Sequence, residues 1–446
     1  MSNSKLKNKT VEPSVQEVQC PVSGIYFSSI GVDVHAQILV CHSQRYDPDS
    51  KSLFESDVRF GTSRQQLELF AQWIIEKNPE VVLMESTGVY WFSPYEALEQ
   101  AGFNTDSIKV VKATEVKAAK GRKTDKVDAK RLSEFARMGS FHNSFIPTKA
   151  VREARQIGRA LHKATLDCAR YSNRLHKLFS ASGSRLSSVF SDINGKTATK
   201  IIEAYLDKEW QEFVSVVRKL NSRLKAAFED ILDAFAHVSP QMKTLLKEVR
   251  GQLIQAKSYR DRLEELLRDS LMPYSKLVSR LTTIPGVKEL SALKIVSEIG
   301  GDLSKFRNIE AFCSWIGICS GNNESAGKRK SGSSPKGNPY LRTYLAEVGQ
   351  SIGLMKTTET QLRVCFQALK ERRGHNRAVI AIGHKVVRVI YAMITKDEPY
   401  VEKDCHTLKA VRLARLVNSI RKAPEVELAV NGASVVDLKS GQIYKT

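Results

Sequence analysis

Hydrophobic and polar positions alternate in the N-terminal part of the chain, and this alternation predicts β-strands. Three early segments have it: IYFSSIGVDV (25–34), QILVCH (37–42) and DVRF (57–60). The spacing then changes, because Leu67, Phe70 and Ile74 recur at helical intervals and Ser63 is placed to cap a helix. These segments predict three strands followed by an amphipathic helix.

The following segments predict a repeating order of strand and helix. VVLME (81–85) is a short apolar run typical of a buried strand, and it is followed by a loop and a helix that ends at Gly102. A further strand is expected over 107–111 and a helix over 125–137. Residues 25–140 are therefore expected to form an α/β sheet with helices on its faces.

The rest of the chain is predicted to be mainly helical. Residues 1–24 are polar and are expected to be a flexible tail, and residues 141–280 form a helical middle region. Within it, apolar residues repeat every seven positions between Met242 and Leu271, which indicates a coiled coil. An amphipathic helix on a globular core explains the same pattern nearly as well, because the run is only about four heptads long.

A long polar loop interrupts the helices of the third region, residues 281–400. The segment SGNNESAGKRKSGSSPKGNPY is rich in Gly, Ser and Asn, and apolar helices flank it on both sides. Long polar loops inside a domain are usually functional or disordered. Residues 401–446 form a C-terminal extension whose pattern predicts no specific structure.

An excess of positive charge points to a polyanionic partner. The 446 residues include 69 Lys and Arg against 48 Asp and Glu, a formal net charge of +21. Nucleic acid is the leading candidate, because basic residues that neutralise phosphates release counterions. An anionic membrane would require a basic amphipathic helix beside an apolar anchor, and the sequence has none. A basic surface that serves only solubility is the remaining alternative.

Cysteine spacing and the first residues favour the cytoplasm. The seven cysteines have no CxxC pair, as expected for free thiols in a reducing compartment. The first sixteen residues are polar and contain no apolar signal segment. The most apolar helix, 378–394, contains His384, Lys385 and Arg388 and is too short and too charged to cross a bilayer. We therefore expect no membrane association.

Four acidic residues are candidates for a metal site. Asp33 lies within an apolar strand, where a charge is costly unless it is paired or binds a cation. Glu85 ends the next buried strand, and ligands of open α/β sheets bind outside such strand ends. Asp125 and Asp128 are three residues apart, so both lie on one face of the predicted helix. Converging carboxylates suit Mg²⁺ or Mn²⁺, which prefer hard oxygen ligands.

Basic residues surround these acids, as a site that cleaves nucleic acid requires. The candidates for binding phosphates near the acids are Lys120, Arg122, Lys123 and Lys126. Simpler explanations exist for three of the acids: Asp125 could cap its helix, Asp128 could be a first-turn acid favoured by the helix dipole, and Glu85 could lie on the surface. That all four acids occupy these positions in this order by chance is less expected than that any single one does.

Several motifs in the same order resemble one known family. GVDVHAQ around Asp33, MESTGVYW around Glu85 and KTDKVDAKRLSEF around Asp125 look like the DEDD transposases, which have a RuvC-like domain and are related to the Piv and MooV DNA invertases. TIPGV, SEIGGDLSKFRNIEAFCSWIGI, NNESAGKRKSG and KGNPYLR resemble the C-terminal transposase domain of that family. The resemblance covers roughly residues 25–140 and 281–400.

This resemblance implies a fold and a chemistry. It implies an RNase H-like domain that binds metal through Asp33, Glu85, Asp125 and Asp128, and a mostly α-helical transposase domain with a nucleophilic serine, Ser325. Attack by that hydroxyl on DNA would give a covalent intermediate that conserves the energy of the broken strand. Further nucleic-acid contacts are expected at Lys328, Arg329, Lys330, Lys336 and Arg342.

The implied partners are donor and target DNA, an element-encoded guide RNA and further copies of the chain in a dimer or tetramer. The resemblance also implies a bacterial or archaeal cytoplasmic protein associated with the nucleoid. Two alternatives stay open. One is a RuvC-like nuclease that cleaves with water and no serine, and the other is a basic coiled-coil protein that binds nucleic acid without catalysis.

Overall fold

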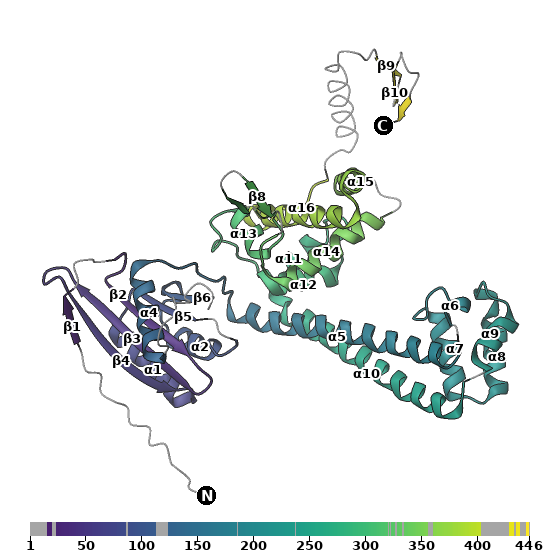
Figure 1. Cartoon of the computed structure of the whole chain (residues 1–446), viewed down its shortest axis with the longest axis horizontal. Helices are drawn as coiled ribbons and strands as arrows, with labels where there is room; N and C mark the ends of the chain where they lie inside the picture. Colours follow the sequence, from purple (N-terminus) through teal and green to yellow (C-terminus); the bar gives the residue numbers. More distant parts are fainter. Residues whose placement is uncertain are drawn as a thin grey trace, which may run out of the picture. The chain divides into compact units, whose positions relative to one another are not determined.

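The chain forms two compact units, Met1–Ile146 and Pro147–Thr446, in a computed structural model (Figure 1). The structure describes residues 16–19, 24–85, 88–112, 124–184, 186–236, 238–319, 321, 323–325, 328–331, 334–355, 360–402, 428–431, 434–437 and 443–445. The division places residues 141–146 with the first unit, since Ile146 is buried in its core. It also keeps the predicted middle region and the third region in one unit.

The first unit is built on a six-stranded mixed sheet with the order β1-β4-β3-β2-β5-β6. Strands β1 to β4 pair in antiparallel fashion, whereas β2–β5 and β5–β6 are parallel. The strands are β1 (Gln16–Gln19), β2 (Ser28–Val34), β3 (Ile38–Asp47), β4 (Ser52–Gly61), β5 (Val81–Glu85) and β6 (Ile108–Val111). The predicted α/β class is confirmed, and the strand order is compatible with an RNase H-like domain.

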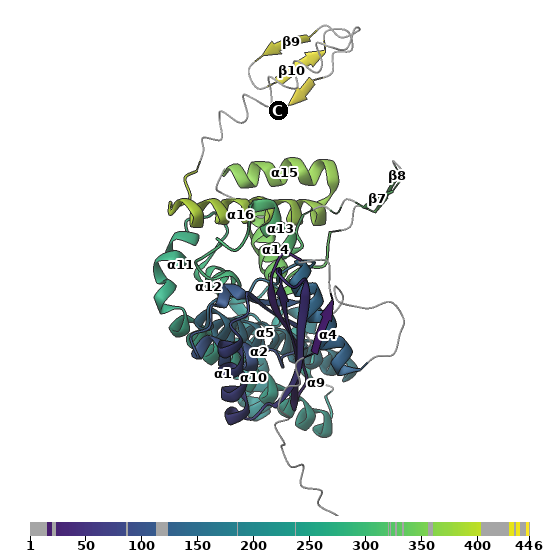
Figure 2. The same cartoon turned by 90° about the vertical axis from the view of Figure 1, so that its left-hand side faces the viewer.

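Helices cover both faces of this sheet. On one face, α1 (Arg64–Lys77) and α2 (Phe92–Gln100) bury apolar strand residues such as Val32 and Met84. On the other, α4 (Asp125–Met138) packs Leu132 and Ala136 against Leu83. Figure 2 shows α1 and α4 on opposite sides of the strands. A short 3-10 helix, η1 (Thr105–Ser107), leads into β6.

The β3–β4 hairpin is longer than the alternation predicted. Its additional residues include His42, Gln44 and Glu55, which are polar yet only 4%, 2% and 6% exposed. Gln44 Nε2 donates to Glu55 Oε1 over 2.8 Å, so these two side chains are hydrogen-bonded to each other inside the protein. Polar residues at buried positions break the hydrophobic pattern, which is why the hairpin ends could not be predicted. Strand β1, within the segment expected to be irregular, pairs with the edge of β4.

Two long antiparallel helices, α5 (Lys149–Ala181) and α10 (Pro240–Ser270), form an arm of the second unit (Figure 1). The heptad residues of α10 are buried against other parts of the same chain, and these are Leu246, Val249, Leu253, Leu263 and Leu267. The seam therefore contacts α5 of its own chain. A coiled coil between copies is not required to explain the pattern.

Short helices at the end of this arm enclose an aromatic core. They are α6 (Leu186–Val189), α7 (Lys196–Asp207), α8 (Trp210–Leu220), η2 (Asn221–Arg223) and α9 (Phe228–Ala236). Phe179 of α5 lies against Phe235, with ring centroids 5.8 Å apart, and Tyr205 and Phe213 pack beside them. This small core fixes the end of the arm.

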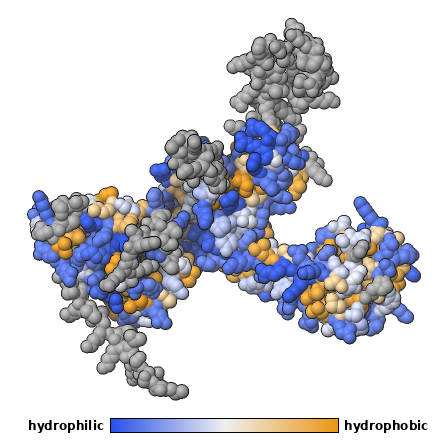
Figure 3. Space-filling model, viewed as in Figure 1, coloured by the Kyte–Doolittle hydropathy of each residue, from blue (hydrophilic) through white to orange (hydrophobic). Residues whose placement is uncertain are grey.

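Most of the remaining helices form a group around α16 (His375–Lys396). They are η3 (Met272–Tyr274), α11 (Ser275–Leu281), α12 (Glu289–Ile299), α13 (Ile309–Ile316), α14 (Pro339–Leu354) and α15 (Gln361–Arg373). Strands β7 (Asn323–Ser325) and β8 (Lys328–Ser331) pair with each other, and β9 (Leu428–Asn431), β10 (Ser434–Asp437) and β11 (Ile443–Lys445) form a three-stranded sheet of their own. Helix α16 is longer than the predicted 378–394, and by length and composition it could cross a membrane, so the prediction that it is too short and too charged was wrong. Its residues Ile382, Val386 and Ile390 are buried among the other helices. The surface over α15 is hydrophilic (Figure 3).

Helix α4 lies so close to β2 that only glycine fits between them. A Cβ atom on Gly31 would lie 2.3 Å from the Ala129 carbonyl oxygen and 2.3 Å from the Ser133 nitrogen. Both atoms belong to the helix backbone, which cannot move aside alone. Ser29 Oγ donates to the Ser133 carbonyl over 2.9 Å and fixes the helix at the same level. The position of α4 on the sheet therefore depends on Gly31.

We expect Gly31→Ala to destabilise the protein by about 1–3 kcal/mol, the usual cost of overpacking. Gly251→Ala is the matched control, because Gly251 lies inside α10 and a methyl group on it would extend into open space. Alanine there should stabilise by roughly 0.5–1 kcal/mol, since it reduces the entropy of the unfolded chain. Urea denaturation followed by circular dichroism measures both. A Gly31→Ala variant as stable as the wild type would contradict the close contact.

Candidate active site

Asp33 and Glu85 lie beside each other on two parallel strands. The register pairs Val32 of β2 with Met84 of β5, so the next residues along both strands are these two acids. Side chains alternate between the faces of a strand. Asp33 therefore shares the face of Gly31, and Glu85 shares the face of Leu83, which packs against α4. Both carboxylates thus belong to the α4 side of the sheet.

The first turn of α4 brings two more carboxylates to this place. Thr124 caps the helix, because its Oγ1 accepts a hydrogen bond from the Val127 nitrogen over 3.4 Å. Asp125 and Asp128 therefore need not cap the helix, which removes one of the simpler explanations for Asp125. Asp128 lies 3.6 Å from Arg131 Nη1 and is 21% exposed.

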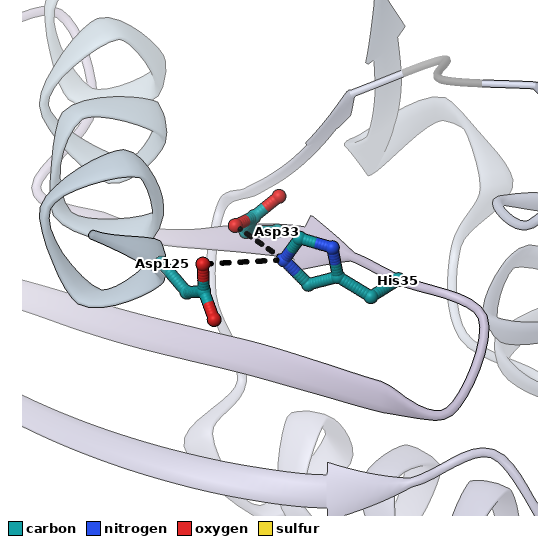
Figure 4. A group of neighbouring side chains, drawn as sticks. All are labelled: Asp33, His35 and Asp125. Atoms are coloured by element: carbon teal, nitrogen blue, oxygen red, sulfur yellow. Dashed lines mark hydrogen bonds and ion pairs between the residues drawn. The ribbon is translucent and has the colours of Figure 1, made fainter. Parts of the chain in front are cut away.

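Asp33, His35 and Asp125 come together at one point (Figure 4). His35 Nε2 lies 3.0 Å from Asp33 Oδ2 and 3.6 Å from Asp125 Oδ1. One ligand atom from each residue lies within 4.8 Å of the others, a spacing that a single metal ion can bridge. The side chain of Asp33 is 10% exposed, whereas those of His35 and Asp125 are 44% and 55% exposed. The group thus opens from a buried acid to the solvent.

Burial raises the pKa of Asp33 above its ordinary value of 3.8. The nearby carboxylates of Asp128 and Glu85 raise this pKa further, and His35 opposes them. Asp33, Glu85 and Asp128 therefore interact electrostatically, although Glu85 and Asp128 lie outside the tight group of three, and Asp125 joins that group through His35. A buried carboxylate whose charged form is disfavoured by its surroundings is suited to binding a cation.

His35 was not predicted from the sequence. It follows β2 directly and lies two residues after Asp33, so it continues the same face of the strand. This spacing in GVDVHAQ is the signal that could have identified it. Imidazole is a ligand of Mn²⁺ and related metals and also a hydrogen-bond partner that orients a ligating carboxylate.

A second polar cluster lies beside the acids, between α4 and the β3–β4 hairpin. Lys130 Nζ donates to Glu55 Oε2 over 2.7 Å, and Lys126 Nζ lies 3.5 Å from Asp57 Oδ2. Although burial alone would raise it, the pKa of Glu55 is lowered by the bonds from Lys130 and Gln44. Lys126, predicted to bind nucleic acid, thus has an acidic partner within the protein but keeps 59% of its side chain exposed.

Ser325 lies in the other compact unit, at the end of strand β7. The β7–β8 hairpin pairs Ser325 with Lys328, and its register shifts between Asn323 and Glu324. Of the predicted phosphate contacts, Lys328, Arg329 and Lys330 belong to β8. Lys336 is exposed and Arg342 is half-buried on α14, while Lys120, Arg122 and Lys123 lie outside the described residues.

Comparisons with known proteins agree with these motifs. The sequence model of the IS110-type DEDD transposases matches residues 30–182, and that of the transposase IS116/IS110/IS902 family matches residues 278–363. The transposase for insertion sequence element IS1111A of Coxiella burnetii is 29% identical over 165 residues, which are 36% of this chain and 45% of that protein. A probable family 20 transposase of Pseudomonas aeruginosa is 26% identical over 161 residues, 36% and 47% respectively. These alignments span about half the length of each relative.

Asp33→Asn tests the metal site through stability. Because burial raises the pKa of Asp33, the folded protein binds a proton there more readily than the unfolded chain. The contribution of this group to stability is therefore lost as the pH rises from 3.8 through the raised value. Without divalent ions, we expect Asp33→Asn to raise the melting temperature at neutral pH, and this gain should vanish below pH 3.8.

Mn²⁺ should reverse the order of thermal stability of the wild type and Asp33→Asn. Millimolar Mn²⁺ should stabilise the wild type, whereas the affinity of Asp33→Asn for the ion should fall at least tenfold, roughly the least effect of disturbing a metal ligand. Asp49→Asn is the control, since Asp49 is exposed in the β3–β4 turn and loses the same charge. Equal Mn²⁺ stabilisation of the wild type and Asp33→Asn would exclude Asp33 as a ligand.

Proposed function

The chain belongs to the IS110-type DEDD transposase family, and from this premise we propose that it cuts and rejoins DNA at the ends of a mobile insertion element. The observation that carries the proposal is the convergence of Asp33, His35 and Asp125 on the α4 side of the sheet, with Glu85 and Asp128 close enough to affect Asp33. The net charge of +21 suits a DNA substrate.

Asp33, Glu85, Asp125 and Asp128 would hold Mg²⁺ or Mn²⁺, with His35 as a further ligand or as the residue that orients Asp33. The fit rests on chemistry: hard oxygen donors surround a carboxylate that is mostly buried and whose charge is disfavoured there. When bound, divalent ions stabilise the charge that develops on the entering and leaving oxygens of a phosphoryl transfer.

Ser325 would supply the nucleophile. Its hydroxyl oxygen forms a bond to phosphorus and loses its proton, while the bond from phosphorus to a deoxyribose oxygen breaks and that oxygen takes up a proton. The strand remains joined to the protein as a phosphoserine ester, so a second transfer to another strand needs no external energy. The basic residues Lys328 and Arg329, which follow Ser325 in the hairpin, would hold the phosphate.

Two separate compact units hold the two parts of this chemistry, the acids in one and Ser325 in the other. Both must reach one phosphodiester, and they can come from one copy of the chain or from two. We propose a homo-oligomer in which DNA brings them together. A guide RNA that pairs with donor and target DNA would supply sequence specificity, as the family resemblance implies, and the positive charge would bind its backbone.

Trapping of a covalent intermediate tests the proposal. With DNA carrying the ends of the element, its noncoding RNA and Mg²⁺, the wild type should form a protein–DNA adduct that survives denaturation. Ser325→Ala should reduce adduct formation by at least about 10³-fold, as expected when a nucleophile is removed. Ser331→Ala is the matched control, because Ser331 belongs to the same hairpin, and its adduct should form normally.

The nuclease alternative makes the opposite prediction. If water is the nucleophile, Ser325→Ala cleaves DNA at the wild-type rate and neither protein forms an adduct. A non-catalytic binding protein predicts that Asp33→Asn leaves every DNA activity unchanged. Either result would overturn the proposed function.

A further inference from the structure

The loop that carries Ser325 has a narrow neck, where its two ends touch. The loop connects α13 to α14, and Gly317 and Gly337 are at its two ends. A Cβ atom on Gly337 would lie 2.3 Å from the Gly317 nitrogen, and Gly317 has a φ of +77°. The Asn338 nitrogen donates to the Trp315 carbonyl over 3.1 Å and closes the neck. The points at which the loop leaves α13 and enters α14 are therefore fixed by this contact.

Asn338 joins the neck to two helices at once. Its Oδ1 accepts hydrogen bonds from the Tyr340 and Leu341 nitrogens over 3.1 and 3.2 Å and so caps α14. Its Nδ2 donates to Glu298 Oε2 of α12 over 2.7 Å. The residue is 8% exposed, so both ends of its amide are used inside the protein. Capping alone would use only the oxygen.

Glu298 is a fully enclosed carboxylate held by two arginines of α5. Its side chain is 1% exposed and accepts a two-pronged bond from Arg159, with Nε at 2.8 Å and Nη2 at 3.0 Å. Arg155 Nε lies 3.4 Å away, and Arg155 Nη2 donates to the Glu298 carbonyl over 2.6 Å. Burial lowers the pKa of Arg155 to about 10, so it remains charged at neutral pH. Both arginines therefore contribute to holding the carboxylate.

A glycine allows α5 to approach α12 this closely. A Cβ atom on Gly158 would lie 2.6 Å from Oγ of Ser297, the residue before Glu298. Gly158 lies between Arg155 and Arg159, so the close approach occurs at the level of both guanidinium groups. Helix α5 begins at Lys149, just after the boundary between the two compact units. The neck of the serine loop is thus anchored to the first helix of the second unit.

We propose that Glu298 and Asn338 are positioning residues for Ser325, and that they fix the neck of its loop to α5 through Arg155 and Arg159. The inference rests on the proposed role of Ser325. The sequence of this loop has hardly any apolar residues that could pack against the rest of the protein, so the neck limits the volume that the serine can reach. A displacement of about 1 Å can reduce the rate of a positioned reaction by roughly 100-fold.

Asn338→Asp separates this role from helix capping. Aspartate caps helices as well as asparagine does, so a cap alone predicts no change. The anchor predicts a loss, because the aspartate cannot donate to Glu298 and repels it. We expect the rate of adduct formation with Mg²⁺ and DNA to fall by at least about tenfold with less than a twofold change in DNA affinity. Hydrogen exchange of residues 323–331 should accelerate by about tenfold while that of α16 stays unchanged.

Two further variants complete the test. Asn308→Ala removes a cap of the same kind from α13, where Asn308 Oδ1 accepts from the Ala311 nitrogen, and it should leave loop exchange and adduct rate at wild-type values. Arg159→Lys keeps the charge but loses the two-pronged bond to Glu298. Like Asn338→Asp, it should accelerate loop exchange and slow adduct formation. The proposed anchor would be overturned if loop hydrogen exchange in Asn338→Asp matched that of the wild type. It would also be overturned if either variant accelerated exchange in α16 as much as in the loop. Absence of a wild-type adduct would instead refute the proposed function, while exchange still tests the anchor.

Discussion

A carboxylate in the interior of an apolar sheet requires a positive charge beside it. Asp33 is such a carboxylate, and the rest of the candidate site depends on how its charge is neutralised. Burial disfavours its charged form, and the neighbouring acids increase this effect. His35, which directly follows the same strand, partly offsets this effect through its contact with Asp33. The simplest function for such an arrangement is to bind a divalent cation, which neutralises several acids at once.

The backbone contact between α4 and β2 makes this arrangement possible. Gly31 lets the helix lie against the strand, and Thr124 caps it without using Asp125. Lys130 and Glu55 fasten the side of the helix that faces the β3–β4 hairpin. The first turn of α4 is therefore placed beside Asp33 by contacts on the strand side and on the hairpin side, which is the rigid support that a metal site needs.

Much of the first unit could be predicted from local patterns, since Ser63 caps α1 and the strand that contains Asp33 lies where the alternation placed it. What could not be predicted depends on partners distant in the chain. The buried polar pair of Gln44 and Glu55 hid the length of the hairpin, and Asp57, which lies near Lys126, is remote in sequence. The heptad pattern of α10 could be recognised in the sequence, but its packing partner, α5 of the same chain, could not. The four acids were identified jointly by the strand pattern and family resemblance, whereas Ser325 came from the resemblance alone.

The most direct measurement is the anomalous scattering of Mn²⁺ in crystals of the full chain. We predict an ion whose distance to carboxylate oxygens of Asp33 and Asp125 is about 2.1 Å, the usual length for a small divalent cation. Glu85 or Asp128 should complete its coordination directly or through water. Crystals in which Mn²⁺ occupies other acidic groups, and leaves Asp33 without an ion, would contradict a metal site at this end of the sheet.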